Sequence, residues 1–304
     1  MINKKTAGFD LPHLHQDDKL RRVLDSALKN KLGNPSDVQM APLSSYWNAA
    51  YFGLDKVKIF QEATVEEQTE ILDCSACGLL EEAYFIEKAG VGYMAKMVSL
   101  AESSEERMLY ALFSADEVTH LIQISRFLPN SEMRGTDNAF LRLLEDLAET
   151  QDKTVLLFVL QVVLEGWGLT HYRSLAKNCR NVDFSSVLQS FLQDESRHHG
   201  TGVTLLDRTN VTKSSQQTII EVLALFLQMV QVGPQSVVAA IEKVKGDLSR
   251  QQKVQIFEQL NTENHSSSRL QLLRSLMRSP NMGTIVEELE VRGVFQPLPA
   301  EKCV

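Results

Sequence analysis

Apolar residues recur at intervals of three and four positions along most of the chain, which is the period of one face of an α-helix. Four long stretches of this kind contain no internal proline: residues 64–101, 103–127, 153–177 and 184–206. Shorter stretches cover residues 17–32, 138–149, 214–232, 235–261 and 263–278. The pattern predicts an all-α fold with four long helices, extended by further N-terminal and C-terminal helices.

The organisation expected from this pattern is simple. No shift in composition separates two domains, so the sequence predicts one domain over residues 1–304. Within it, residues 64–207 would form the core and residues 208–304 would add accessory helices. The tail 294–304 contains two of the eight prolines, and we expect it to be loosely attached.

Composition narrows the class of protein. Hydrophobic residues make up 43% of the 304 positions, which is enough for a sizeable core. Only 15 glycines and 8 prolines are present, too few for a turn-rich all-β chain. The 31 basic and 39 acidic residues give a formal charge of −8, which argues against nucleic-acid binding through bulk charge.

No segment predicts export or membrane insertion. The first ten residues lack the apolar run of a signal peptide. The most apolar stretches, 155–164 and 222–232, fall short of the roughly 20 apolar residues that span a bilayer. Four cysteines in 304 residues do not make a disulfide framework. We therefore expect a cytoplasmic protein with neither a membrane nor a nucleic acid as partner.

Two of the predicted long helices carry the same pattern of acidic residues and histidine. The segments DEVTH and DESRH each place a Glu and a His three residues apart: Glu117 with His120, and Glu195 with His198. Residues at this spacing project from one face of a helix, so the pair can bind one metal ion or bridge to a second. One match would mean little, but two matches in a chain with seven histidines are a specific signal.

A glutamate in apolar surroundings stands 30 residues before each of these motifs. Glu87 precedes Glu117, and Glu165 precedes Glu195, at this same distance. A glutamate buried in such a run without a partner costs several kcal/mol. Coordination of a metal would remove that cost, so both residues become candidate ligands.

The two halves agree beyond these glutamates. Each has a glycine three positions after the lone Glu, a Phe four positions before the paired Glu, and an Asp directly before it: Gly90 and Gly168, Phe113 and Phe191, Asp116 and Asp194. The agreement indicates an internal duplication of a helix pair, with pseudo-twofold symmetry.

With these motifs, residues 64–206 resemble the ferritin-like di-metal carboxylate superfamily. Its four-helix bundles take one Glu from each of two helices and a Glu-x-x-His from each of two others. The resemblance implies this bundle and six ligands: Glu87, Glu117, His120, Glu165, Glu195 and His198. It also implies two iron ions, with manganese able to take either position, and four carboxylates would balance two divalent cations.

Other residues are assigned to the surroundings of this centre. We expect Asp116 and Asp194 to accept the free N–H groups of the ligand imidazoles. Gly90 and Gly168 each weaken a helix interior by about 1 kcal/mol relative to Ala. They either allow close helix crossing or leave room for dioxygen or substrate. Three aromatic residues are candidates for an apolar pocket beside the metals: Phe113, Phe191 and Trp167.

The superfamily includes proteins that store iron, destroy peroxide, generate radicals or oxygenate substrates, so fold alone does not name the reaction. Position 124 is Ile where a ribonucleotide reductase small subunit commonly keeps a radical Tyr. Position 191 is Phe where arylamine N-oxygenases usually add a seventh ligand. The resemblance therefore favours an O₂-activating oxygenase or oxidase. It would act on a C–H or N–H bond of a small organic substrate. The reducing equivalents would come from an external partner, a small reductant or the substrate itself.

Two other functions stay open at this point. One is a non-oxygenase ferritin-like protein that handles metal or scavenges peroxide, and the other is a scaffold with a structural metal. Nothing in the sequence identifies the substrate, the native metal pair or the electron donor. The helices allow a homodimer, although no apolar stripe requires one.

Overall fold

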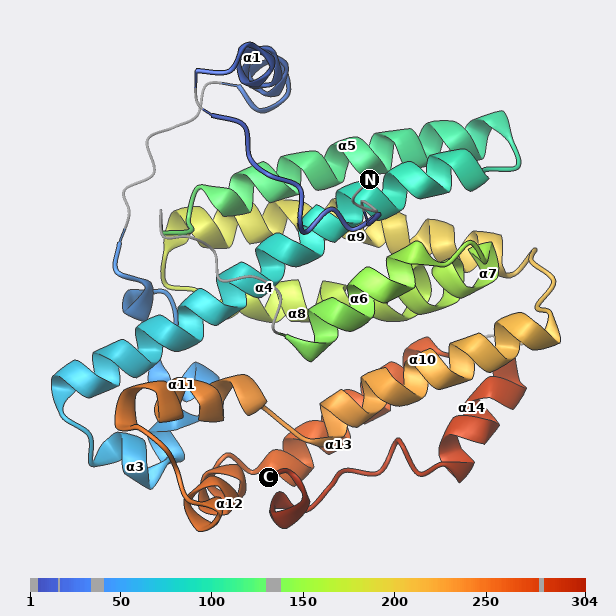
Figure 1. Cartoon of the computed structure of the whole chain (residues 1–304). Helices are drawn as coiled ribbons and strands as arrows, with labels where there is room; N and C mark the ends of the chain where they lie inside the picture. The colour runs from blue at the N-terminus through green and yellow to red at the C-terminus, as the bar shows by residue number, and fades with distance from the viewer. Residues whose placement is uncertain (1–4, 16, 34–40, 130–137, 279–281) are drawn as a thin grey trace. The chain divides into compact units, whose positions relative to one another are not determined.

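The computed structural model describes residues 5–15, 17–33, 41–129, 138–278 and 282–304 (Figure 1). Within these ranges the chain forms helices and irregular connections, and no β-strand is found there. The all-α fold class is therefore confirmed.

The helices are α1 (Lys19–Leu32), α2 (Ala49–Phe52), α3 (Lys58–Gln61), α4 (Val65–Leu100), α5 (Ser104–Ser125), α6 (Ala139–Glu149), α7 (Lys153–Val155), η3 (Leu156–Leu164), α8 (Glu165–Asn178), α9 (Val182–Leu206), α10 (Lys213–Gln231), α11 (Gln235–Lys245), α12 (Arg250–Gln259), α13 (Thr262–Leu276) and α14 (Gly283–Val291). Most predicted helices begin and end close to the bounds that the apolar pattern gives, while α2, α3 and α14 were not predicted. The described residues also form short 3₁₀ turns: η1 (Leu43–Ser45), η2 (Leu54–Lys56) and, after α14, η5 (Ala300–Lys302).

Local side-chain chemistry fixes several helix starts. Ser103 accepts a hydrogen bond from the Glu106 N–H at the start of α5, at 3.1 Å. Asn181 accepts one from the Phe184 N–H at the start of α9, at 2.9 Å. Each cap satisfies an N–H group that has no partner inside its own helix.

One helix predicted over residues 235–261 is two helices. α11 ends at Gly246, whose φ of 80° lies in the left-handed region that only glycine adopts at low cost. α12 then starts with a capping box, in which Ser249 and Gln252 each bond the other's main-chain N–H. The apolar period continues across the break, so periodicity alone did not reveal it.

The chain divides into two compact units, and the long helix α4 contributes to both. The first unit comprises Met1–Met40 and Leu80–Glu149, and the second comprises Ala41–Leu79 and Thr150–Val304. The single-domain organisation with a core at 64–207 stays a prediction.

In the first unit, the segment before α1 packs against the second half of α4. The Phe9 ring meets the Phe85 ring edge-on, with centroids 5.3 Å apart. The Lys88 ammonium donates to the Phe9 carbonyl at 3.2 Å. The Thr6 carbonyl lies against Gly92, where an added Cβ would come within 1.8 Å of its oxygen. Gly92 is therefore required for this close approach of two backbones.

In the second unit, the helices η3, α8 and α9 lie in close contact. Glycines allow this: a Cβ at Gly202 would come within 2.7 Å of the Gln161 side chain, and a Cβ at Gly166 within 2.9 Å of His199. A separate apolar core in the same unit joins η2, α3 and the start of α4 to α11 and α12.

The C-terminal tail is tied to the second unit, so the expectation of loose attachment was wrong. Cys303 is buried, and its carbonyl accepts a hydrogen bond from Gln235 Nε2 at 2.8 Å. Gln231 Nε2 donates to the carbonyls of Gly293 and Gln296, at 3.1 Å and 2.5 Å. The tail is held by side chains that are distant in sequence, which a local pattern of prolines does not show.

One helical segment of the described chain, Lys153–Asn178, has the length and apolar composition to cross a membrane by itself. Its most apolar window is 67% buried inside the protein, as in the core helix of a water-soluble protein. α10 and α11 pass the same test only as a pair, and the chain bends by 49° between them. The cytoplasmic location stays a prediction.

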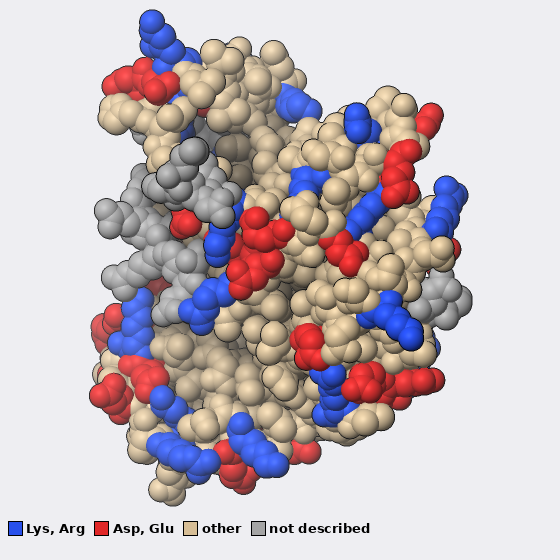
Figure 2. Space-filling model, turned by 45° about the vertical axis from the view of Figure 1, so that its right-hand side comes forward, with Lys and Arg blue, Asp and Glu red and all other residues tan. Residues whose placement is uncertain are grey.

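Charged side chains of both signs are mixed on the face drawn in Figure 2. Blue Lys and Arg groups stand beside red Asp and Glu groups, with uncharged surface between them. This face therefore presents mixed charge rather than a continuous basic surface.

We predict that Gly92→Ala loosens the N-terminal segment, because the new methyl group would overlap the Thr6 carbonyl. The free energy of unfolding should fall by about 1–3 kcal/mol, as for other overpacked sites. Urea denaturation and the rate of proteolysis near the N-terminus would measure this. Gly78→Ala on the same helix is the control, because its Cβ would meet no atom within 4 Å. It should be neutral or stabilising by up to about 1 kcal/mol. Equal stability of the two variants would contradict the prediction.

Candidate metal centre

Three of the predicted ligands come together in the first unit, where α4 and α5 lie side by side. Glu87 on α4 is 1% exposed, and on α5 Glu117 is 5% and His120 is 1% exposed. Glu117 and His120 share the buried face of α5 because three residues are close to one helical turn. The Nδ1 atom of His120 lies 3.2 Å from Oε2 of Glu87.

Gly90 makes room for the carboxylate of Glu117. A Cβ at Gly90 would come within 2.3 Å of Glu117 Oε2 and 2.7 Å of its Cδ. The space beside Gly90 therefore holds the side chain of a predicted ligand. Close helix crossing or room for dioxygen or substrate at Gly90 stays a prediction.

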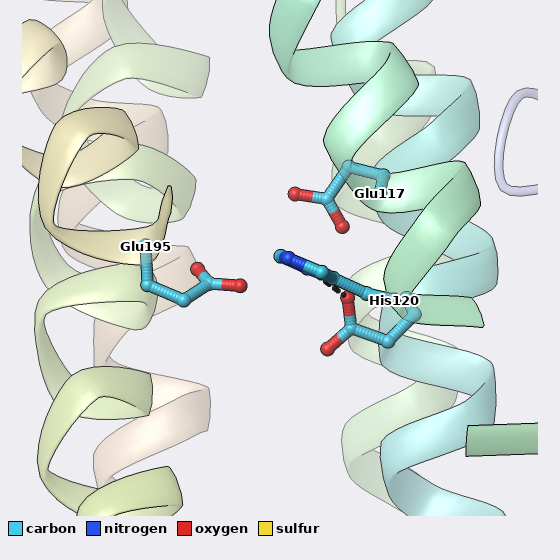
Figure 3. A group of neighbouring side chains, drawn as sticks. Glu117, His120 and Glu195 are labelled. Carbon is cyan, nitrogen blue, oxygen red and sulfur yellow. Dashed lines mark hydrogen bonds and ion pairs between the residues drawn. The ribbon is translucent and has the colours of Figure 1, made fainter. Parts of the chain in front are cut away.

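Four buried side chains form a group that could hold a metal ion: Glu87, Glu117, His120 and Glu195. Each offers a ligand atom within 4.8 Å of the others'. Figure 3 draws Glu117, His120 and Glu195, whose polar ends point toward one another. Three carboxylates with one imidazole suit iron, manganese or zinc, and a cation would offset the cost of burying these acids. The donor set therefore fits a metal.

Glu165 and His198, the other two predicted ligands, lie in the second unit and are not members of that group. His198 is fully buried on α9, with Nδ1 at 3.8 Å from Glu195 Oε2. Glu165 is half-buried at the first position of α8. The role of both as ligands stays a prediction.

Glu165 stands where a π-helix becomes an α-helix, a feature that the sequence did not reveal. The segment η3 is π-helical over nine residues, and the Glu165 N–H donates to the Leu160 carbonyl, five residues back. Beyond it, α8 is a regular α-helix. In a π-helix each N–H group bonds the carbonyl five residues back, and in an α-helix the carbonyl four residues back. At the transition between the two, the main chain of the helix has one more carbonyl than it has N–H groups to bond them. π-Helical segments are rare and frequently lie at functional sites.

Gln161 joins this junction to α9. Its side chain is fully buried, and Nε2 donates to the His198 carbonyl at 2.8 Å. The main-chain oxygen of Gln161 lies 3.2 Å from His199 Nδ1, so the imidazole is a hydrogen-bond partner for this carbonyl. Sequence reasoning missed this role. The available signal was one glutamine inside an otherwise apolar run of ten residues, 155–164.

The two aspartates next to the ligands were expected to orient imidazoles. Asp194 forms an ion pair with Arg197, one turn further along the same helix. Asp116 is half-buried on α5. Hydrogen bonds from these carboxylates to the ligand imidazoles stay a prediction.

The aromatic pocket candidates occupy different environments. Phe113 and Phe191 are buried on α5 and α9. The Phe191 ring meets the Tyr172 ring edge-on at 5.9 Å. Trp167 packs against Phe226 of α10 at 5.4 Å, so its contact is with the C-terminal helices. A pocket formed by the three candidates stays a prediction.

His171 follows Trp167 by one turn on α8, with the two ring centroids 6.1 Å apart. Burial, together with the positive charge of Arg269, lowers the pKa of His171 to about 4. The imidazole is therefore neutral at pH 7.

No protein-family model matches the chain, and a comparison with curated proteins found no match. The assignment of this centre therefore depends on the residues and their geometry.

We predict that Gly90→Ala lowers metal affinity at least tenfold, about 1.4 kcal/mol, because the methyl group would displace the Glu117 carboxylate. Gly168→Ala is the matched control from the other half, since its Cβ would meet no atom within 4 Å. Titration calorimetry with Fe²⁺ under anaerobic conditions measures both. Wild-type affinity in Gly90→Ala would show that the Glu117 carboxylate is not confined by this glycine.

We also predict that His171 makes stability depend on pH. Its pKa is about 4 in the folded protein and near 6.5 when unfolded, so the unfolded chain binds more protons between these values. Unfolding free energy should therefore fall as the pH drops from 6.5 to 4. His171→Gln should reduce that slope, as followed by urea denaturation at several pH values. Parallel pH profiles for the two proteins would contradict this.

Proposed function

We propose that this chain is an O₂-activating oxidase or oxygenase with a dinuclear non-haem centre of iron, or of manganese and iron, in a ferritin-like four-helix bundle. The observation that carries the proposal is the buried group of Glu87, Glu117, His120 and Glu195. Acidic side chains are rarely this deeply buried unless they are paired or bind a cation. Metal ions bound by this group would offset the cost of burying its acids.

In this proposal, six residues hold two metal ions. They are the four carboxylates of Glu87, Glu117, Glu165 and Glu195 and the imidazoles of His120 and His198, which would together hold the ions. Two contacts support the arrangement, because each half places an imidazole nitrogen near a carboxylate oxygen: 3.2 Å for His120 and Glu87, and 3.8 Å for His198 and Glu195. Four carboxylates also balance the charge of two divalent cations.

When bound, the metals would supply open coordination positions and the electrons that reduce O₂. The protein's own residues hold the ions and keep water away. The buried side chains of Phe113 and Phe191 lie on the ligand-bearing helices and would form an apolar surround. Gly168, one turn after Glu165, has no heavy atom within 4 Å of where a Cβ would stand, so it leaves space there. A small organic substrate with an oxidisable C–H or N–H bond suits such surroundings.

A second candidate function is a metal-handling or structural site without oxygen chemistry. The contact of the Glu117 carboxylate with Gly90 favours it, because that part of the centre is filled by protein atoms. A closed site would bind metal without reacting with O₂.

The test is metal content after anaerobic ferrous reconstitution, followed by O₂ uptake. We expect about two metal ions per chain in the wild type. In Glu117→Ala/Glu195→Ala the metal should be lost, because the variant lacks two carboxylates of the buried group. Glu105→Ala, on the exposed side of α5, is the control and should keep wild-type metal content. Oxygen uptake by the reduced protein is then screened with small amines, acids and aldehydes.

The outcomes separate the candidates. Two metals with substrate-dependent O₂ uptake support the oxygenase or oxidase. Two metals with no O₂ uptake favour a structural or metal-handling site, and loss of added H₂O₂ without organic substrate indicates peroxide scavenging. Less than one metal per chain after reconstitution would reject a dinuclear centre.

A further inference from the structure

Large apolar side chains that face solvent are unevenly distributed over the described residues. Nine of the fifteen lie either in residues 11–32 or on α5, and all nine belong to the first unit. Single exposed apolar residues are normal on a protein surface, whereas groups of them mark sites of interaction. The two groups therefore need an explanation.

The first group is the apolar face of α1. No residue of α1 is buried, and Leu20, Val23 and Leu24 are 63%, 64% and 46% exposed. Their spacing of three and four places them on one side of the helix. The other positions of α1 carry a single acid, Asp25, and five basic residues: Lys19, Arg21, Arg22, Lys29 and Lys31. This helix is thus basic and amphipathic, in a chain whose formal charge is −8.

The second group is the outward face of α5. Met108 and Leu112 are 58% and 61% exposed, four residues apart, on the side of the helix opposite the predicted ligands. Exposed acids, Glu102 and Glu105, stand at its N-terminal end, with Arg107 as the neighbouring base. The α5 face is therefore apolar with an acidic end.

We propose that α1 of one copy of this chain docks onto the α5 face of a second copy, and reciprocally, in a two-fold symmetric homodimer. The apolar faces would cover each other, and the basic residues of α1 would meet the acidic end of α5. Because α1 contacts α5 within its own unit, one two-fold axis can bring both reciprocal contacts together. A closed two-fold pairing leaves neither face exposed, which a one-way contact would not achieve.

Sedimentation velocity over a range of protein concentrations tests the proposal. The wild type should be a dimer. Leu20→Gln/Leu24→Gln on α1 and Met108→Gln/Leu112→Gln on α5 should each weaken dimerisation at least tenfold. Leu225→Gln on α10 is the control, because Leu225 is also exposed, at 52%, but lies in the second unit. All variants should keep wild-type helix content and bound metal, since none of these residues is a predicted ligand.

Mixing the α1 variant with the α5 variant makes the test specific. Such a pair contains one intact contact, between the wild-type α1 of one chain and the wild-type α5 of the other, so dimers should return in part. Pairing of α1 with α1, or of α5 with α5, would give no recovery on mixing and would overturn the proposed exchange.

Three further results would overturn it. They are a monomeric wild type at all concentrations, dimers that persist in both double variants, and loss of dimers in Leu225→Gln alone. Co-sedimentation with phosphatidylserine vesicles tests the alternative that α1 binds an anionic lipid surface. If the wild type is a monomer that binds these vesicles and the α1 variant does not, then α1 faces an anionic lipid surface instead.

Discussion

A carboxylate removed from water must be matched by a cation or by hydrogen-bond donors, and this constraint governs the centre of the molecule. Three glutamates at positions 87, 117 and 195 are between 1% and 6% exposed, and they form one group with His120. Such a group raises the energy of the folded chain unless something positive binds it. The buried face of α5 places Glu117 beside His120, and Gly90 on α4 leaves room for the Glu117 carboxylate.

The two halves of the sequence repeat, but the structure uses the repeated positions differently. Gly90 accommodates the carboxylate of Glu117, whereas a side chain at Gly168 would meet nothing within 4 Å. Glu165 follows a π-helical segment, whereas its counterpart Glu87 lies inside α4. The repeated positions of the two halves therefore have unequal surroundings in the structure.

In the second unit, the contact between η3 and α9 supports the predicted ligand positions. Gln161 bonds the backbone beside His198, and His199 bonds the backbone of Gln161. Gly202 and Gly166 allow the helices to come this close. Buried polar groups that satisfy each other fix one packing arrangement, because any shift would leave them unpaired in an apolar interior. On α1 and α5, by contrast, apolar side chains face solvent, and the proposed dimer would cover them.

The sequence by itself determined the all-α class and most helix bounds, and it named candidate ligands, because periodicity and Glu-x-x-His spacing depend on positions within one helix. Four of the six proposed ligands come together as a group. Only the structure showed the break at Gly246, the attachment of the tail, the π-helical junction before Glu165 and the contact of Gly90 with Glu117. The break is a local matter of backbone conformation and capping, whereas the tail and the Gly90 contact depend on atoms that are distant in sequence. Local pattern carries no record of such contacts, because they arise from how the helices pack.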